Sequence, residues 1–186
     1  ILLAVNYRSA AIEEHFGDGE ALGLDIGYLR EDRPLGSAGA LTLARDELKQ
    51  PFVVLNADLL TNVNLGALIR FHTREGNAIT VGVRRYAVEV PYGVVDVEGT
   101  SVTGLQEKPT IGFFINAGIY AVDPAAVGHM PDTVDEFNMT DVIDAALGAG
   151  RRVGAFPVRE YWLDIGHLAD YERARQDHVT HFTVGL

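Results

Sequence analysis

Two carboxylates follow short apolar segments of this sequence at positions that suit a divalent metal. Asp58 comes shortly after the apolar residues 52–55, and Asp164 lies two residues after Trp162, the only tryptophan. Ligands of open α/β sheets bind at the carboxyl ends of strands, and Mg²⁺ prefers oxygen ligands such as carboxylates. A metal held by two carboxylates can bridge phosphate oxygens. The alternative is that each aspartate only makes an Asx-turn or caps the next helix.

A glycine-rich segment, LGSAGAL at residues 35–41, precedes a predicted helix. Backbone N–H groups at a helix start lack intrahelical partners and, with the helix dipole, suit an anion or the edge of a nucleotide. The segment matches neither a P-loop nor the G-x-G-x-x-G dinucleotide motif. The alternative is an ordinary helix start at which Ser37 is the cap and the glycines form the turn.

Two more segments carry polar residues beside strands. Glu107 and Lys108 are adjacent near the end of a predicted strand, so we expect them to point to opposite faces. One could then contact hydroxyl groups while the other reaches a phosphate. The alternative is that both are solvated charges on an edge strand, which prevent the edge from pairing with another strand. Asn116 and Gly118 lie in an aromatic-rich strand, where a glycine indicates close approach of a ligand or of another backbone.

Composition excludes several classes of function. The 186 residues are 47% hydrophobic and carry a formal charge of -11, which argues against a nucleic-acid-binding surface. No apolar run approaches the roughly 20 residues of a membrane-spanning helix. The absence of cysteine excludes disulfides and thiolate metal sites and fits a cytoplasmic protein. The length predicts a single domain over residues 1–186.

Helical and strand patterns alternate through the first half of the chain, which predicts a mostly parallel, helix-covered sheet. Apolar residues 52–55 predict a strand buried on both faces, and Ser9 is the predicted cap of the first helix. Between residues 93 and 122 the strands follow one another too closely for crossover helices, so they should pair antiparallel. The predicted fold is therefore α/β, with a Rossmann-like mixed sheet. Further strands are predicted at 1–5, 24–31, 78–85 and 153–158, and helices at 9–16, from the glycine-rich segment to 48, and at 65–75, 140–147 and 168–178.

Six motifs occur in a fixed order: LGSAGAL, LNAD, YGVV, EKP, INAGIY and WLDIG. Together they resemble the sugar-phosphate nucleotidyltransferase family, and LGSAGAL and WLDIG are most similar to its mannose-1-phosphate guanylyltransferase-like members. The resemblance implies transfer of a nucleoside monophosphate from an NTP, with GTP favoured, to a sugar 1-phosphate. It also implies Mg²⁺ as the cofactor and pyrophosphate as the second product.

The same resemblance implies a role for each matching position. Lys108 and Asp58 are the implied catalytic residues, and Asp58 and Asp164 the implied metal ligands. The implied sugar-binding residues are Tyr92, Gly93, Glu107, Asn116 and Gly118, and the implied nucleotide-binding residues are Leu35, Gly36, Ser37, Ala38 and Gly39. In addition, Glu31 or Asp32 could accept hydrogen bonds from guanine; the alternative there is a solvated acidic turn.

The family's leading motif, G-G-x-G-T-R-L, is absent from the sequence. We therefore expect residues before Ile1, such as an additional N-terminal domain, or a partner chain to supply that part, and we expect residues 1–186 alone to be inactive. A homo-oligomer is a further expectation for the protein. Two alternatives are a non-catalytic sugar-nucleotide-binding module and a GT-A glycosyltransferase. The second normally shows D-x-D, whereas Leu60 stands two residues after Asp58.

Overall fold

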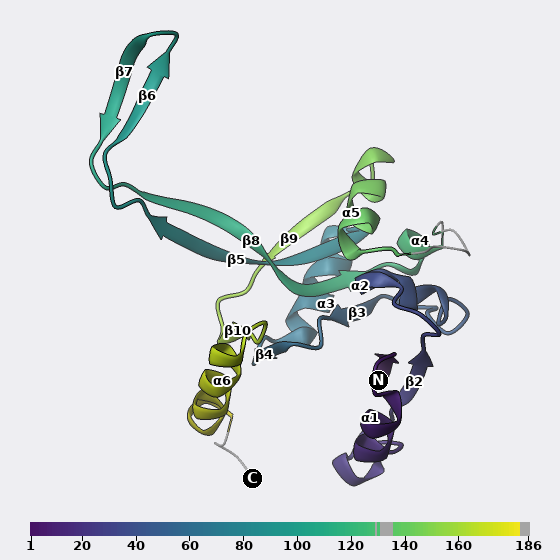
Figure 1. Ribbon diagram of the computed structural model, residues 1–186. Coiled ribbons are helices and arrows are strands. Elements are labelled where there is room, and N and C mark those ends of the chain that lie inside the picture. Colours follow the sequence, from purple (N-terminus) through teal and green to yellow (C-terminus); the bar gives the residue numbers. More distant parts are fainter. Residues whose placement is uncertain (129, 131–135, 183–186) are drawn as a thin grey trace. The chain divides into compact units, whose positions relative to one another are not determined.

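The structure is a computed structural model that describes residues 1–128, 130 and 136–182 (Figure 1). These residues form two compact units. The first contains Ile1–Asn56, Leu65–Thr80 and Tyr120–Gly154, and the second contains Ala57–Asn64, Val81–Ile119 and Ala155–Leu186 as far as they are described. Within the described ranges no helix is both long enough and apolar enough to cross a bilayer.

The largest sheet has four strands in the order β3-β8-β5-β9. These strands are β3 (Phe52–Leu55), β5 (Ile79–Glu89), β8 (Thr110–Val122) and β9 (Val153–Pro157). The bond from Asp123 N to Ala78 O joins the end of β8 to the start of β5, so this pair is antiparallel. Hydrogen bonds run from Ala78 N to Arg152 O and from Val158 N to Val83 O. The residue numbers of the bonded pairs increase together along the two strands, so β5 and β9 are parallel. The predicted mixed α/β sheet is confirmed, with β8 in the same sheet as β3 and β5.

The other strands of the described ranges form three smaller two-stranded sheets. Strand β1 (Leu2–Val5) pairs in parallel with β2 (Gly27–Arg30). Strand β4 (Leu59–Thr61) pairs antiparallel with β10 (Trp162–Asp164). Strands β6 (Val94–Glu98) and β7 (Ser101–Gln106) form an antiparallel hairpin, as predicted, whose two-residue turn begins at Gly99 with φ 59°. A positive φ at this position suits glycine and matches the twist of the strands.

The helices of the structure are α1 (Ser9–Phe16), α2 (Gly36–Gly39), α3 (Leu65–Glu75), α4 (Pro124–Val127), α5 (Met139–Gly148) and α6 (Leu168–His181), with short 3-10 turns at Glu20–Leu22 and Ala40–Thr42. Helix α3 has the predicted bounds and ends at Gly76, whose φ of 62° only glycine adopts freely. The helix predicted to reach residue 48 is instead the four-residue α2 followed by 3-10 and turn structure. Glycines at 36 and 39 weaken a longer helix there.

Two sequence interpretations are wrong in detail. Arg8, with φ 56°, occupies the cap position of α1, and Ser9 is the first helical residue. Strand β3 is half-buried and not buried on both faces, because it is the edge strand of its sheet and Leu55 is 44% exposed. An apolar run of four residues cannot distinguish these two environments, since its neighbours are set by the tertiary structure.

A buried polar cluster lies among the core residues of the first unit. His72 on α3 and Thr80 on β5 are 2% and 0% exposed, and their Nδ1 and Oγ1 atoms are 3.0 Å apart. Asn77 Nδ2 donates to the same hydroxyl oxygen over 2.9 Å, and Asn77 N donates to His72 O. These hydrogen bonds satisfy polar groups that would otherwise be costly to bury, and they fix the turn between α3 and β5.

Replacing His72 by glutamine is expected to flatten the pH dependence of stability below about pH 6.5. Burial lowers the pKa of His72, and the nearby Asp123 carboxylate opposes this only partly. The unfolded chain therefore binds a proton near the ordinary pKa of about 6.5 that the folded chain does not bind. The unfolding free energy of the native protein should fall as the pH drops through this range. Denaturant unfolding between pH 5 and 7.5 measures it, and His15→Gln, at an exposed histidine, should keep the native slope.

Candidate functional site

Strands β4 and β10 of the second unit lie side by side (Figure 1), and their antiparallel pairing brings the backbones of the two predicted metal ligands close together. Asp164 is paired with Leu59, the residue after Asp58, and Ile165 N donates to Asp58 O over 2.8 Å. Asn62 N and the Thr61 hydroxyl both bond to Tyr161 O and extend this connection beyond the strands. Two aspartates separated by 106 positions in the sequence thus have neighbouring backbones along one short ladder.

Both carboxylates are exposed, and within the described part of the chain neither forms a hydrogen bond or an ion pair through its side chain. The cap alternative is wrong for Asp164, because α6 begins at Leu168 and His167 occupies its cap position. No group of three or more potential metal-binding side chains occurs among the described residues. Two unpaired carboxylates fit a cation such as Mg²⁺, which usually takes one or two carboxylates and completes its shell with water and substrate phosphates.

Tyr161 anchors the chain just before β10. Its hydroxyl donates to Asp177 Oδ2 of α6 over 2.7 Å. Burial, together with this hydrogen bond, raises the pKa of Tyr161 to about 12, so the phenol keeps its proton and remains a donor. Helix α6 is thereby tied to the strand that carries Asp164.

The β6–β7 hairpin brings the YGVV and EKP motifs together. Val94 is paired with Gln106, so Gly93 and Glu107 lie opposite each other just beyond the paired residues. A Cβ atom added to Gly93 would approach Glu107 Oε2 to 3.1 Å, which is tight for any residue larger than glycine. Tyr92 beside them is 75% exposed.

Lys108 and Glu107 do not alternate across a strand as the sequence predicted. Strand β7 ends at Gln106, and the two residues form the bend that leads to β8. Lys108 has φ 45°, in the left-handed region that non-glycine residues rarely adopt. Its side chain is exposed, and in the described ranges its ammonium group has no carboxylate partner.

Strand β8 carries Asn116 and Gly118 on either side of the fully buried Ala117. Gly118 has φ 68°, and its N–H donates to Asn116 Oδ1 over 3.0 Å. The Trp162 indole Nε1 donates to Ala117 O over 2.8 Å. The segment that carries Asn116 is therefore bonded directly to the strand that carries Asp164, a connection that the sequence analysis did not anticipate.

The glycine-rich segment lies in the first unit, and four of the five N–H groups of residues 35–39 already have acceptors within the protein. Ala38 N and Gly39 N donate to Phe137 O, and Ser37 N donates to Asn138 Oδ1. Leu35 N donates to Glu31 Oε2 over 3.0 Å. The interpretation that free N–H groups bind an anion here is therefore wrong in this structure. Gly36, with φ 77°, is needed for the close packing, since an added Cβ would lie 2.6 Å from Phe137 O.

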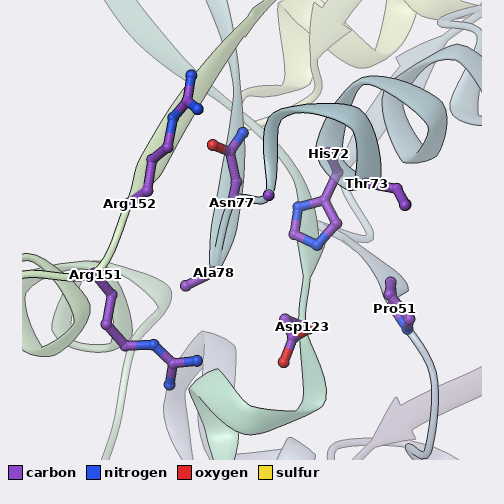
Figure 2. A pocket seen from close by; sticks show the side chains of 9 residues that line it. Pro51, His72, Thr73, Asn77, Ala78, Asp123, Arg151 and Arg152 are labelled. Atoms are coloured by element: carbon purple, nitrogen blue, oxygen red, sulfur yellow. The ribbon is translucent and has the colours of Figure 1, made fainter.

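The first unit also contains a cavity of about 320 Å³ beside the His72 cluster (Figure 2). Figure 2 shows the side chains of Arg151 and Arg152 extending in opposite directions along its wall. Arg151 Nη1 donates to Ala125 O, and Arg152 pairs with the Glu75 carboxylate over 2.8 Å. Among the described residues that line this cavity, none belongs to the predicted site.

The sequence model of the nucleotidyl transferase family matches residues 1–181. The chain belongs to this family. It is 32% identical over 181 residues to the mannose-1-phosphate guanylyltransferase catalytic subunit beta of Dictyostelium discoideum, covering 92% of this chain and 49% of that protein. It is 30% identical over 204 residues to the subunit of the same name in Xenopus tropicalis, covering 100% of this chain and 55% of that protein. The nucleotidyl transferase chain thus spans about half the length of these curated relatives.

Solved structures support the nucleotidyl transferase fold. HddC from Yersinia pseudotuberculosis, solved in complex with GMP-PN, has a TM-score of 0.70 and 21% sequence identity to this chain. The comparison covers 95% of this chain and 77% of that one. At this identity the likeness concerns the fold, and it agrees with the mixed sheet described above.

Proposed function

We propose that the protein transfers GMP from GTP to a hexose 1-phosphate, mannose 1-phosphate first among them, and releases pyrophosphate. The β4–β10 pairing carries the proposal, because it brings the backbone of Asp58 next to that of Asp164, and both side chains are exposed with no protein partner in the described ranges. Relatives 30–34% identical are named mannose-1-phosphate guanylyltransferases, which supports this choice of substrates. Residues 1–186 would act as one nucleotidyltransferase domain.

In the proposed reaction a phosphate oxygen of the sugar 1-phosphate attacks the α-phosphorus of the NTP. The new P–O bond forms as the bond from the α-phosphorus to the bridging oxygen breaks, and pyrophosphate leaves with that electron pair. Because no proton has to be abstracted from the attacking phosphate, no side-chain nucleophile or base is required. Positioning and charge neutralisation supply the catalysis.

Each proposed residue has a task in this scheme. Asp58 and Asp164 would hold Mg²⁺, which when bound neutralises charge on the triphosphate. Lys108 would contact the phosphate of the sugar 1-phosphate, since its ammonium is exposed and unpaired in the described chain. Glu107 and Asn116 would accept hydrogen bonds from sugar hydroxyls, and Tyr92, Gly93 and Gly118 would shape the surface against which the sugar lies.

The nucleobase would lie against the glycine-rich segment, residues 35–39. Because the N–H groups of Leu35, Ser37, Ala38 and Gly39 are occupied, contacts to the base would come mainly from backbone carbonyls and from the glycine surfaces. The Glu31 carboxylate already accepts from Leu35 N. The exposed Asp32 is therefore the better candidate of the two acidic residues to accept from N1–H and the exocyclic amine of guanine.

Pyrophosphate release by the protein at its natural length, with GTP, dTTP, UTP and CTP each tested against a panel of hexose 1-phosphates, examines the proposal directly. We expect GTP with mannose 1-phosphate to give the highest kcat/KM, and Asp32→Asn to reduce the preference for GTP. A site that hydrogen-bonds one base can reject another by about 10⁴-fold, because its polar groups are then left unpaired. A clear preference for dTTP or UTP would contradict the guanylyl assignment, and absence of release with every pair would contradict the transferase itself.

A further inference from the structure

Trp162 stands between two parts of the proposed site. It belongs to β10 and lies two residues before Asp164, so the two side chains are on the same face of the strand. Leu163 between them points to the opposite face and is 8% exposed. The indole ring is thus on the side of the strand from which the candidate metal ligand projects.

The indole is fixed at both its polar and its aromatic surface. Its Nε1 donates to Ala117 O over 2.8 Å, between Asn116 and Gly118. The Arg84 guanidinium lies over the ring, 5.8 Å from its centroid, and Nη1 of the same arginine donates to Glu160 O over 2.9 Å. A ring held in this way has little freedom to move, because both its N–H and its face are engaged.

The acceptor of this hydrogen bond also has a defined position. Ala117 is fully buried, and the local turn of the backbone is set by Gly118 N donating to Asn116 Oδ1. The left-handed φ of 68° at Gly118 bends the chain at this point. A shift of the indole would therefore be transmitted to the backbone beside Asn116, since the buried carbonyl would otherwise lose its donor.

We propose that Trp162 is a positioning residue that fixes the metal-binding carboxylate Asp164 relative to the sugar-binding segment at Asn116. This inference rests on the proposed function and deepens it, because in-line transfer requires the sugar phosphate and the metal-bound triphosphate to meet in one geometry. Trp162 itself contacts neither substrate. The indole N–H is the part of the side chain that fixes this position, because its hydrogen bond to Ala117 O connects β10, which carries Asp164, to the segment of β8 that carries Asn116.

The chain contains a single tryptophan, so its fluorescence reports on this position alone. Mn²⁺ is paramagnetic and quenches indole emission at short range, and it commonly replaces Mg²⁺ at carboxylate sites. Titrating the protein at its natural length with Mn²⁺ is expected to give saturable quenching. Asp164→Asn should abolish the saturable part, and Asp144→Asn, which changes an exposed aspartate of α5, should leave it intact.

Trp162→Phe then tests the connection, because it keeps an aromatic ring and removes the N–H donor. Calorimetry is expected to show Mn²⁺ affinity within about twofold of wild type, since Asp58 and Asp164 remain. The dissociation constant for mannose 1-phosphate, measured with Mn²⁺ and the unreactive α,β-methylene analogue of GTP present, should rise about tenfold, which corresponds to about 1.4 kcal/mol. Tyr161→Phe is the matched control: it removes the neighbouring hydrogen bond to Asp177 and should leave the affinity for mannose 1-phosphate unchanged.

The outcomes separate the two proposals. Absence of saturable quenching in the wild-type protein, or of mannose 1-phosphate binding to it, would overturn the proposed function and the inference with it. Normal binding of both ligands by wild type, together with unchanged mannose 1-phosphate affinity in Trp162→Phe, would overturn the inference alone. Equal losses of affinity for Mn²⁺ and for mannose 1-phosphate in Trp162→Phe and Tyr161→Phe, with matching falls in Tm, would also overturn the inference, because that result indicates a purely structural role for Trp162.

Discussion

Asp58→Asn and Asp164→Asn are each expected to lower kcat/KM for nucleotidyl transfer by about 10²- to 10³-fold. Asparagine preserves the size of the side chain and removes the negative charge that would hold Mg²⁺. Metal stabilisation of a phosphoryl-transfer transition state contributes several kcal/mol, and each 1.36 kcal/mol is about tenfold in rate. Initial rates of pyrophosphate release at saturating GTP, across a range of Mg²⁺ concentrations, measure the effect.

The Mg²⁺ dependence of these variants decides whether the aspartates act through a metal. If they are ligands, raising the Mg²⁺ concentration should recover part of the lost activity, because each variant retains one carboxylate. Asp144→Asn should behave as wild type. Full activity in either site variant would remove that residue from the metal site. A loss of activity accompanied by a comparable loss of stability would indicate that the aspartate supports the β4–β10 pairing instead.

Lys108→Ala and Lys108→Gly are each expected to lower kcat/KM for the sugar 1-phosphate by about 10- to 100-fold. A hydrogen bond to a charged group contributes about 1.5–3 kcal/mol, and both substitutions remove the ammonium group. The two variants should nevertheless differ in stability. Lys108 has φ 45°, a conformation that costs a residue with a Cβ atom about 1–2 kcal/mol and costs glycine little.

We therefore expect Lys108→Gly to unfold at a higher denaturant concentration than Lys108→Ala while being equally poor in catalysis. Denaturant unfolding and steady-state kinetics on the same preparations test both parts. Lys49→Ala, at the chain's only other lysine, should leave kcat/KM unchanged. Recovery of activity in Lys108→Gly would show that the backbone conformation, and not the charge, is what the site requires. Residues in strained backbone conformations cluster at functional sites. A Lys108→Gly variant that gains stability but loses activity would show that Lys108 is one of these strained functional residues.

The elements that sequence patterns predicted well are those that local chemistry determines. Helix α3 follows from its apolar period and from the glycine that ends it. The β6–β7 hairpin follows from a two-residue turn that starts with glycine. In both cases residues close in sequence make the stabilising contacts, so a short window of the chain contains the information.

Predictions failed where the partner of a residue is distant in the sequence. The N–H groups of the glycine-rich segment bind Phe137 and Asn138, about a hundred residues away. The depth at which β3 is buried depends on its place at the edge of the sheet. Nothing in the residues 35–41 or 52–55 themselves encodes these neighbours, because hydrogen-bond acceptors and burial are supplied by other elements.

The sequence by itself determined the types and the order of the residues that carry chemistry: two aspartates after short apolar segments, one lysine beside a glutamate, and glycines at the turns. Tertiary structure alone decided which of them meet. The ladder between β4 and β10 makes Asp58 and Asp164 neighbours, the hairpin places Gly93 against Glu107, and one indole hydrogen bond joins β10 to β8. The physical reason is that side-chain chemistry is local, whereas proximity between distant residues is fixed only when strands pair and buried polar groups find their partners.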